Sequence, residues 1–128
     1  MTAPRHVRRT VLATPSVVGL LRDLTESCLL AWDLKDRVDD TCLVVSELVT
    51  NALRVASGTA IVLDLWAPVD GRGLNVELWD RSSVRPVPRT PEPDDESGRG
   101  LLIVAALAAD WGVRHLPAGG KVVWARMG

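Results

Sequence analysis

The stretch Ser46-Glu47-Leu48-Val49-Thr50-Asn51-Ala52 places polar side chains inside an otherwise apolar helical pattern. That pattern begins near Asp36 and continues until Ser57-Gly58 ends it. Glu47 and Asn51 are one helical turn apart, so we expect them on the same face of the helix. Taken alone, such a stripe favours a face turned to water, because charged side chains are seldom buried without partners.

Patterns on either side of this helix predict the remaining elements. An upstream helix starts at Pro15 and runs to about Ala31, and the downstream part of the chain alternates between strands and one further helix. We expect strands over residues 59–66, 73–79, 111–116 and 121–126, and a third helix from Gly98 to Asp110. This order predicts an α+β fold, a two-layer α/β sandwich with a mixed, mostly antiparallel sheet and helices on one face.

The segment from Val84 to Ser97 has no such periodicity. Four prolines interrupt it, and it ends in a run of acidic residues. Structureless loops of about 12 or more residues are uncommon in compact domains unless they act as lids or binding loops. We therefore predict a lid loop over about residues 84–97.

The composition is that of one globular domain covering residues 1–128, with a formal net charge of -1. No overall positive field would attract nucleic acid or an anionic membrane, and the basic cluster near the N-terminus is predicted to be a solvated terminal segment. Cys28 and Cys42 lie in apolar patterns without metal-ligand spacing, so we expect them in the core. Without a secretory signal or a membrane-length apolar run, the expected compartment is the cytoplasm.

Two more polar features interrupt apolar elements. Asp80 ends an apolar strand, and Ser97-Gly98-Arg99-Gly100 leads into an apolar helix. An Asp that begins a turn is common, and a glycine turn at a helix start is common too. The glycine turn at Gly98 and Gly100 also has the free amides and the helix dipole that suit a phosphate.

The order of the three features resembles the ATP pocket of the GHKL superfamily, the Bergerat fold. More closely, the stretch from Ser46 to Ala52 is similar to the small anti-sigma-factor serine kinases of bacteria. Gly98-Arg99-Gly100-Leu101 and Gly120-Lys121-Val122-Val123-Trp124 share that similarity. The resemblance covers about residues 17–126.

The resemblance implies a role for each feature. The Asn51 side-chain oxygen would bind the Mg²⁺ that bridges the ATP phosphates, and Glu47 would be the catalytic base. Asp80 would accept a hydrogen bond from the adenine amino group. The segment Gly98-Arg99-Gly100-Leu101 would bind the phosphates beneath the lid. ATP and Mg²⁺ are therefore the expected cofactors.

The function implied is that of an anti-sigma factor with protein serine kinase activity. Its partners would be a sigma factor, an antagonist protein that it phosphorylates, or both. One alternative function stays open, a non-catalytic, nucleotide-dependent binding module. The resemblance also allows a homodimer like those of related proteins. A sensor histidine kinase is disfavoured, because the sequence has no pair of dimerisation helices bearing a phospho-acceptor histidine.

Overall fold

The computed structural model describes residues 5–68, 73–83 and 97–128, without the side chains of residues 97–100. The predicted lid loop lies outside the described residues, except for Ser97, which begins a helix. The elements in chain order are β1 (Arg5–Leu12), α1 (Pro15–Ala31), the 3-10 helix η1 (Lys35–Arg37), α2 (Val38–Ala56), β2 (Ala60–Ala67), β3 (Leu74–Asp80), α3 (Ser97–Leu107), β4 (Asp110–His115) and β5 (Lys121–Met127).

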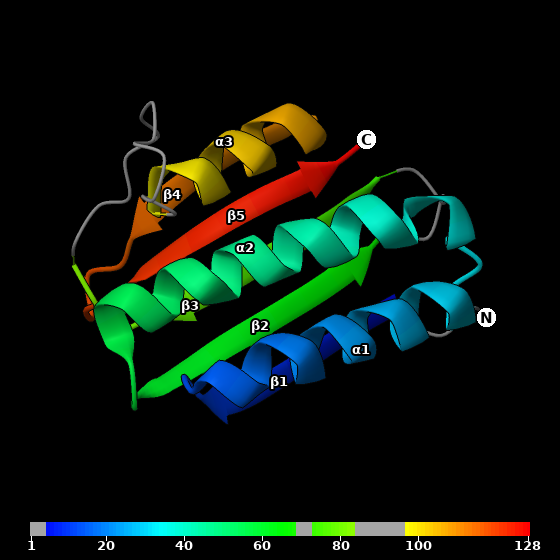
Figure 1. Cartoon of the computed structure of the whole chain (residues 1–128). Helices are drawn as coiled ribbons and strands as arrows, with labels where there is room; N and C mark the ends of the chain where they lie inside the picture. The colour runs from blue at the N-terminus through cyan, green and yellow to red at the C-terminus, as the bar shows by residue number, and fades with distance from the viewer. Residues whose placement is uncertain (1–4, 69–72, 84–96) are drawn as a thin grey trace.

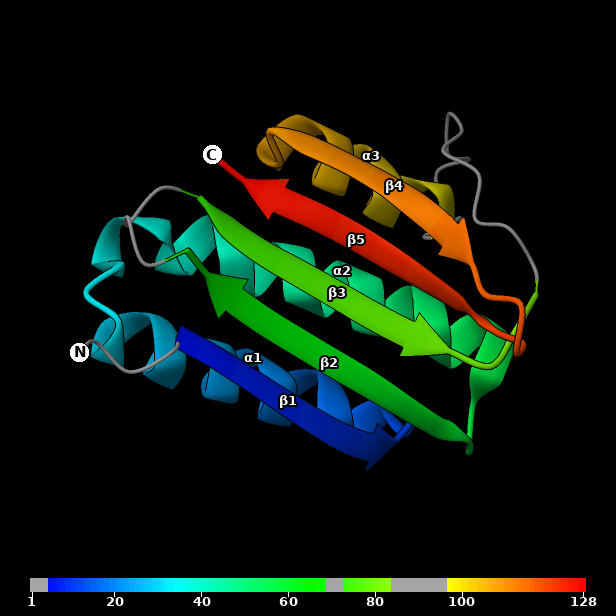
Figure 2. The same ribbon diagram turned by 180° about the vertical axis from the view of Figure 1, so that it is seen from behind.

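The five described strands form one sheet in the order β1-β2-β3-β5-β4, and every neighbouring pair is antiparallel. The three α-helices cover one face of this sheet (Figure 1), and the view from behind shows the strands uncovered (Figure 2). The predicted α+β two-layer sandwich is therefore confirmed. The prediction allowed a mixed sheet, whereas the pairs among the described strands contain no parallel one.

The core fills the space between the sheet and α2. Side chains alternate along β2 and β3, so that every second residue is buried on the helical side. The strand register places Leu63 beside Leu78 and Leu65 beside Val76, which joins the two buried rows. Helix α2 contacts α1, α3 and the sheet, and its buried apolar residues are Cys42, Val44, Val45, Leu48, Val49, Ala52 and Ala56.

The predicted terminal segment forms the edge strand β1 (Arg5–Leu12), which the sequence did not predict, whereas its basic side chains His6, Arg8 and Arg9 are exposed to solvent as expected. His6 and Arg8 lie on the open face of the sheet, where Arg8 Nε and His6 Nε2 contact Asp64 Oδ1 at 2.8 and 2.9 Å. Partial burial alone would raise the pKa of Asp64, but the hydrogen bonds from Arg8 and His6 outweigh it and lower that pKa. These contacts add to the backbone pairing that joins β1 to β2.

Two helix boundaries also differ from those predicted. Helix α2 begins at Val38 rather than Asp36, because residues 35–37 form the separate turn η1. Helix α3 ends at Leu107 rather than Asp110, since Asp110 already pairs with Arg126 in the sheet. The strand ends of the prediction agree with the structure to within one residue.

Truncating a buried side chain of α2 should destabilise the protein far more than truncating an exposed one. Leu48 is 2% exposed and Leu43, on the same helix, is 42% exposed. We expect Leu48→Ala to lower the free energy of unfolding by about 2–5 kcal/mol. Leu43→Ala should change it by less than about 0.5 kcal/mol. Urea unfolding followed by circular dichroism measures both, and equal losses would mean that α2 does not face the core as described.

Candidate functional site

Three elements bring the predicted site residues to one end of the sandwich. The C-terminal end of α2, the end of β3 and the start of α3 lie at the same end in both views (Figures 1 and 2). Glu47 and Asn51 come from α2, Asp80 is the last residue of β3, and Gly98 to Leu101 fall in the first turns of α3. Leu101 is buried, at 1% exposure.

On α2, the structure separates structural polar residues from candidate ligand-binding ones. Ser46 Oγ donates to the Cys42 carbonyl at 2.9 Å, and Thr50 Oγ1 donates to the Ser46 carbonyl at 2.7 Å. These hydroxyls are satisfied within the helix. Glu47 and Asn51 are both half-buried and remain the candidates.

Asn51 carries an unusual feature, a buried amide nitrogen, Nδ2, with no hydrogen-bond partner among the described residues. The other buried polar atom of this kind is Thr41 Oγ1, near the start of α2. Leaving a buried donor unpaired costs about 1–3 kcal/mol. A ligand with oxygen acceptors, such as a phosphate, would remove that cost at Asn51, and the amide oxygen is a suitable donor to Mg²⁺. The residue therefore fits the predicted cofactors.

Asp80 is a buried carboxylate at the end of β3, only 2% exposed. Lys121 is also 2% exposed and lies directly opposite Asp80 in the β3–β5 register. Its Nζ atom donates to both carboxylate oxygens of Asp80, at 2.9 and 3.0 Å. The backbone N–H of Ser82 donates to Oδ1 at 2.8 Å. Lys121 belongs to the stretch Gly120-Lys121-Val122-Val123-Trp124, and its contact with Asp80 adds it to the candidate site.

Gly120 lets β5 come close enough to form this pair. Its φ is +82°, a conformation that favours glycine. A Cβ atom at this position would lie 2.5 Å from the Asp80 carbonyl oxygen and 2.7 Å from Trp79 Nε1. Any side chain would push β5 away from β3 where Lys121 meets Asp80.

The two cysteines do not behave as catalytic nucleophiles. Burial raises the pKa of the Cys28 and Cys42 thiols, which disfavours the reactive thiolate. The described residues also contain no group of His, Cys, Asp or Glu side chains suited to a metal ion. Mg²⁺ is often bound through few protein ligands and the phosphates of a nucleotide, and the Asn51 amide oxygen suits such a site.

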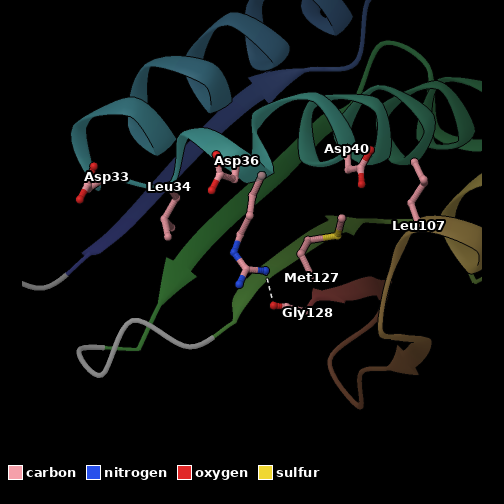
Figure 3. Close-up of a pocket in the computed structure, with 8 residues that line it drawn as sticks. Asp33, Leu34, Asp36, Asp40, Leu107, Met127 and Gly128 are labelled. Carbon is pink, nitrogen blue, oxygen red and sulfur yellow. Dashed lines mark hydrogen bonds between the residues drawn. The ribbon is translucent and has the colours of Figure 1, made fainter.

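A separate pocket of about 500 Å³ (Figure 3) lies at the end of the molecule where α2 begins (Figure 1). Arg37 Nη1 donates to the Gly128 carbonyl within it. Asp40, which lines this pocket, precedes Asn51 by about eleven residues, roughly 16 Å along α2. The pocket is therefore distinct from the predicted nucleotide site. It is lined by Asp33, Leu34, Asp36, Arg37, Asp40, Leu107, Met127 and Gly128.

Comparison with known proteins identifies both a family and a fold. A family model described as a histidine kinase-like ATPase domain matches residues 11–127. The crystal structure of the RsbU and RsbW domains of Rv1364c from Mycobacterium tuberculosis superposes with a TM-score of 0.70 at 20% sequence identity. The match covers 95% of this chain and 32% of that one, so this chain spans about a third of its length. At this identity the likeness shows the fold alone. No curated protein matches the chain.

Substituting Gly120 should disturb the Asp80–Lys121 pair, and Gly119 offers a matched control. Both glycines have positive φ, but a Cβ atom at Gly119 would meet nothing within 4 Å. Backbone strain should affect both alanine variants, whereas crowding should cost Gly120→Ala a further 1–3 kcal/mol, roughly. Thermal and urea unfolding measure the difference. Equal stability of the two variants would mean that β5 tolerates displacement from Asp80.

Proposed function

Because this chain belongs to the histidine kinase-like ATPase family, we propose that it is an ATP- and Mg²⁺-binding regulatory protein that acts as an anti-sigma factor. We further propose that it phosphorylates a serine of an antagonist protein. The observation that supports this proposal is that the second half of α2, with Glu47 and Asn51, the end of β3, with Asp80, and the start of α3 lie at one end of the fold. The resemblance of the same residues to the anti-sigma-factor serine kinases supports the finer assignment.

Asn51 would connect the protein to both the metal and the phosphates. Its side-chain oxygen would bind Mg²⁺, a hard cation that prefers oxygen ligands. Its buried Nδ2 atom would donate to a phosphate oxygen and so gain the partner that it lacks among the described residues. The amides at the start of α3 would hold the remaining phosphate charge, with Arg99 beside them.

Glu47 would act as the catalytic base one turn before Asn51. Bound ATP supplies the phosphoryl group to be transferred, with Mg²⁺ neutralising its charge. The Glu47 carboxylate would accept the proton of the incoming serine hydroxyl. Half-burial of Glu47 on the α2 face shared with Asn51 supports this position for a base.

Asp80 would select adenine among the nucleobases. A carboxylate oxygen accepts a hydrogen bond from the 6-amino group of adenine, whereas guanine has a carbonyl at that position. Two acceptors facing each other in a buried site would be costly, so the pocket would favour adenine. The deep burial of Asp80 supports this, because solvent would otherwise weaken the discrimination.

A non-catalytic binding module is the second candidate. In that case nucleotide would set the shape of a protein-binding surface without phosphoryl transfer, and Glu47 would have no role as a base. The partners proposed are a sigma factor and an antagonist protein, and a homodimer is also proposed. No helix in the described ranges is both long and apolar enough to cross a bilayer. The cytoplasm is the proposed compartment, as it is for the bacterial anti-sigma-factor kinases that the sequence resembles.

Isothermal titration calorimetry with ATP, with and without Mg²⁺, tests the pocket. We expect Mg²⁺-dependent binding by the wild type and a loss of about 10- to 100-fold for Asn51→Ala, since a charged hydrogen bond and a metal ligand disappear. Ser46→Ala is the matched control on α2, because that hydroxyl is already satisfied by the Cys42 carbonyl. It should bind like the wild type.

The outcomes of this titration are distinct. Absence of ATP binding by the wild type would overturn the proposal. Equal losses in Asn51→Ala and Ser46→Ala would show that the helix, rather than the amide, is responsible.

Glu47→Gln distinguishes the kinase from the binding module. The amide keeps the shape of Glu47 but cannot accept the proton, so ATP binding should stay within about threefold while phosphoryl transfer falls by roughly 10²–10⁴-fold. The measurement is transfer of radiolabelled γ-phosphate to a purified antagonist protein of the anti-sigma-factor antagonist class. Wild-type protein that binds Mg²⁺-ATP but transfers no phosphate to such proteins would favour the binding module.

A further inference from the structure

The pair formed by Asp80 and Lys121 has hydrogen-bonding capacity that its own contacts do not use. Oδ1 of Asp80 accepts from both Lys121 Nζ and the Ser82 N–H, whereas Oδ2 accepts only from Lys121 among the described residues. A carboxylate oxygen can accept two hydrogen bonds, and an ammonium group has three N–H donors. One acceptor site on Oδ2 and one donor on Nζ therefore remain, side by side.

Packing alone does not require a charged pair at this position. Along β3 and β5 the neighbouring buried pair is apolar, Leu78 beside Val123. Two apolar residues of similar volume often stabilise a core as well as a buried ion pair does, or better. The charged pair ends this apolar row, on the helical side of the sheet and at the end where α2 finishes and α3 begins.

The backbone also holds Lys121 in this place. Gly120 lies so close to the Asp80 carbonyl that only glycine fits, and it fixes the register in which Lys121 faces Asp80. Both side chains are 2% exposed. A group that contacts them must therefore be enclosed between the sheet and the helices rather than rest on the surface.

We propose that Lys121 is a specificity-determining residue that, together with Asp80, binds the edge of the adenine ring. This inference rests on the proposed ATP-binding function. The edge of adenine presents an amino donor at position 6 beside an acceptor nitrogen, N1. Asp80 Oδ2 accepts from the amino group and Lys121 Nζ donates to N1, so the unused acceptor and donor are both satisfied. The two hydrogen bonds from Lys121 Nζ also hold the Asp80 side chain in place as an acceptor.

The test compares ATP with 1-deaza-ATP, in which N1 is replaced by C–H while the 6-amino group is kept. The wild type should bind 1-deaza-ATP about 10- to 100-fold more weakly than ATP, because a buried charged donor loses its acceptor. In Lys121→Met the two nucleotides should bind within about threefold of each other. A purely structural ion pair would leave the ratio of the two affinities unchanged by the substitution.

Two further variants make the comparison robust. Lys121→Met leaves a buried carboxylate unpaired and can prevent folding, so the same ratio is measured in the double variant Asp80→Asn, Lys121→Met, which removes both charges. Arg114→Met is the matched control, because Arg114 pairs with Glu77 on the open face of the same sheet. It should keep the wild-type ratio.

Each result has one meaning. Equal binding of ATP and 1-deaza-ATP by the wild type would overturn the role of Lys121. A wild-type difference that persists in both Lys121 variants would also overturn it, since another donor would then contact N1. If neither nucleotide binds the wild type, the proposed ATP-binding function itself fails, and this inference fails with it.

Discussion

The fold depends on the packing of α2, whose apolar residues are buried on three sides. It packs on the sheet beneath it and on α1 and α3 at its flanks, and these contacts use its apolar residues. Few positions are left for polar side chains. Glu47 and Asn51 take two of them in the second half of the helix, while Ser46 and Thr50 are satisfied by the helix backbone. The helix that holds the layers together therefore also fixes where ligand-binding groups can lie.

Local patterns predicted most of the fold because they depend on neighbouring residues only. Alternation in residues 73–79 and helical spacing after Pro15 each identified an element whose buried face is apolar. Strand β1 was not predicted, because local patterns do not detect pairing with a distant part of the chain. It lies at the edge of the sheet, and the exposed residues Arg8 and Arg9 interrupt any apolar alternation. Its pairing with β2 depends on contacts far along the chain, including that of Arg8 with Asp64.

The candidate site was predictable only in part. Glu47, Asn51 and Asp80 stand out because they are polar residues in or at the end of apolar elements, and the family resemblance connected them. Lys121 gave no comparable signal. It begins a strand after two glycines, where a lysine is ordinarily exposed. Its burial follows from the pairing of β3 with β5, which joins residues 41 positions apart.

Three features that oppose folding lie at the end of the molecule where the site is proposed. An unpaired amide at Asn51, a buried ion pair and a crowded glycine each oppose the stability that the apolar core provides. Such features persist when the surrounding structure fixes them, and they concentrate at functional sites. Asp33, with φ of +61°, is at the other end, but aspartate tolerates this conformation in turns. Thr41 Oγ1, the second unpaired buried atom, lies near the start of α2 and so away from the proposed site. Three of these costs are thus at the same end of the sandwich as the residues that carry the family resemblance.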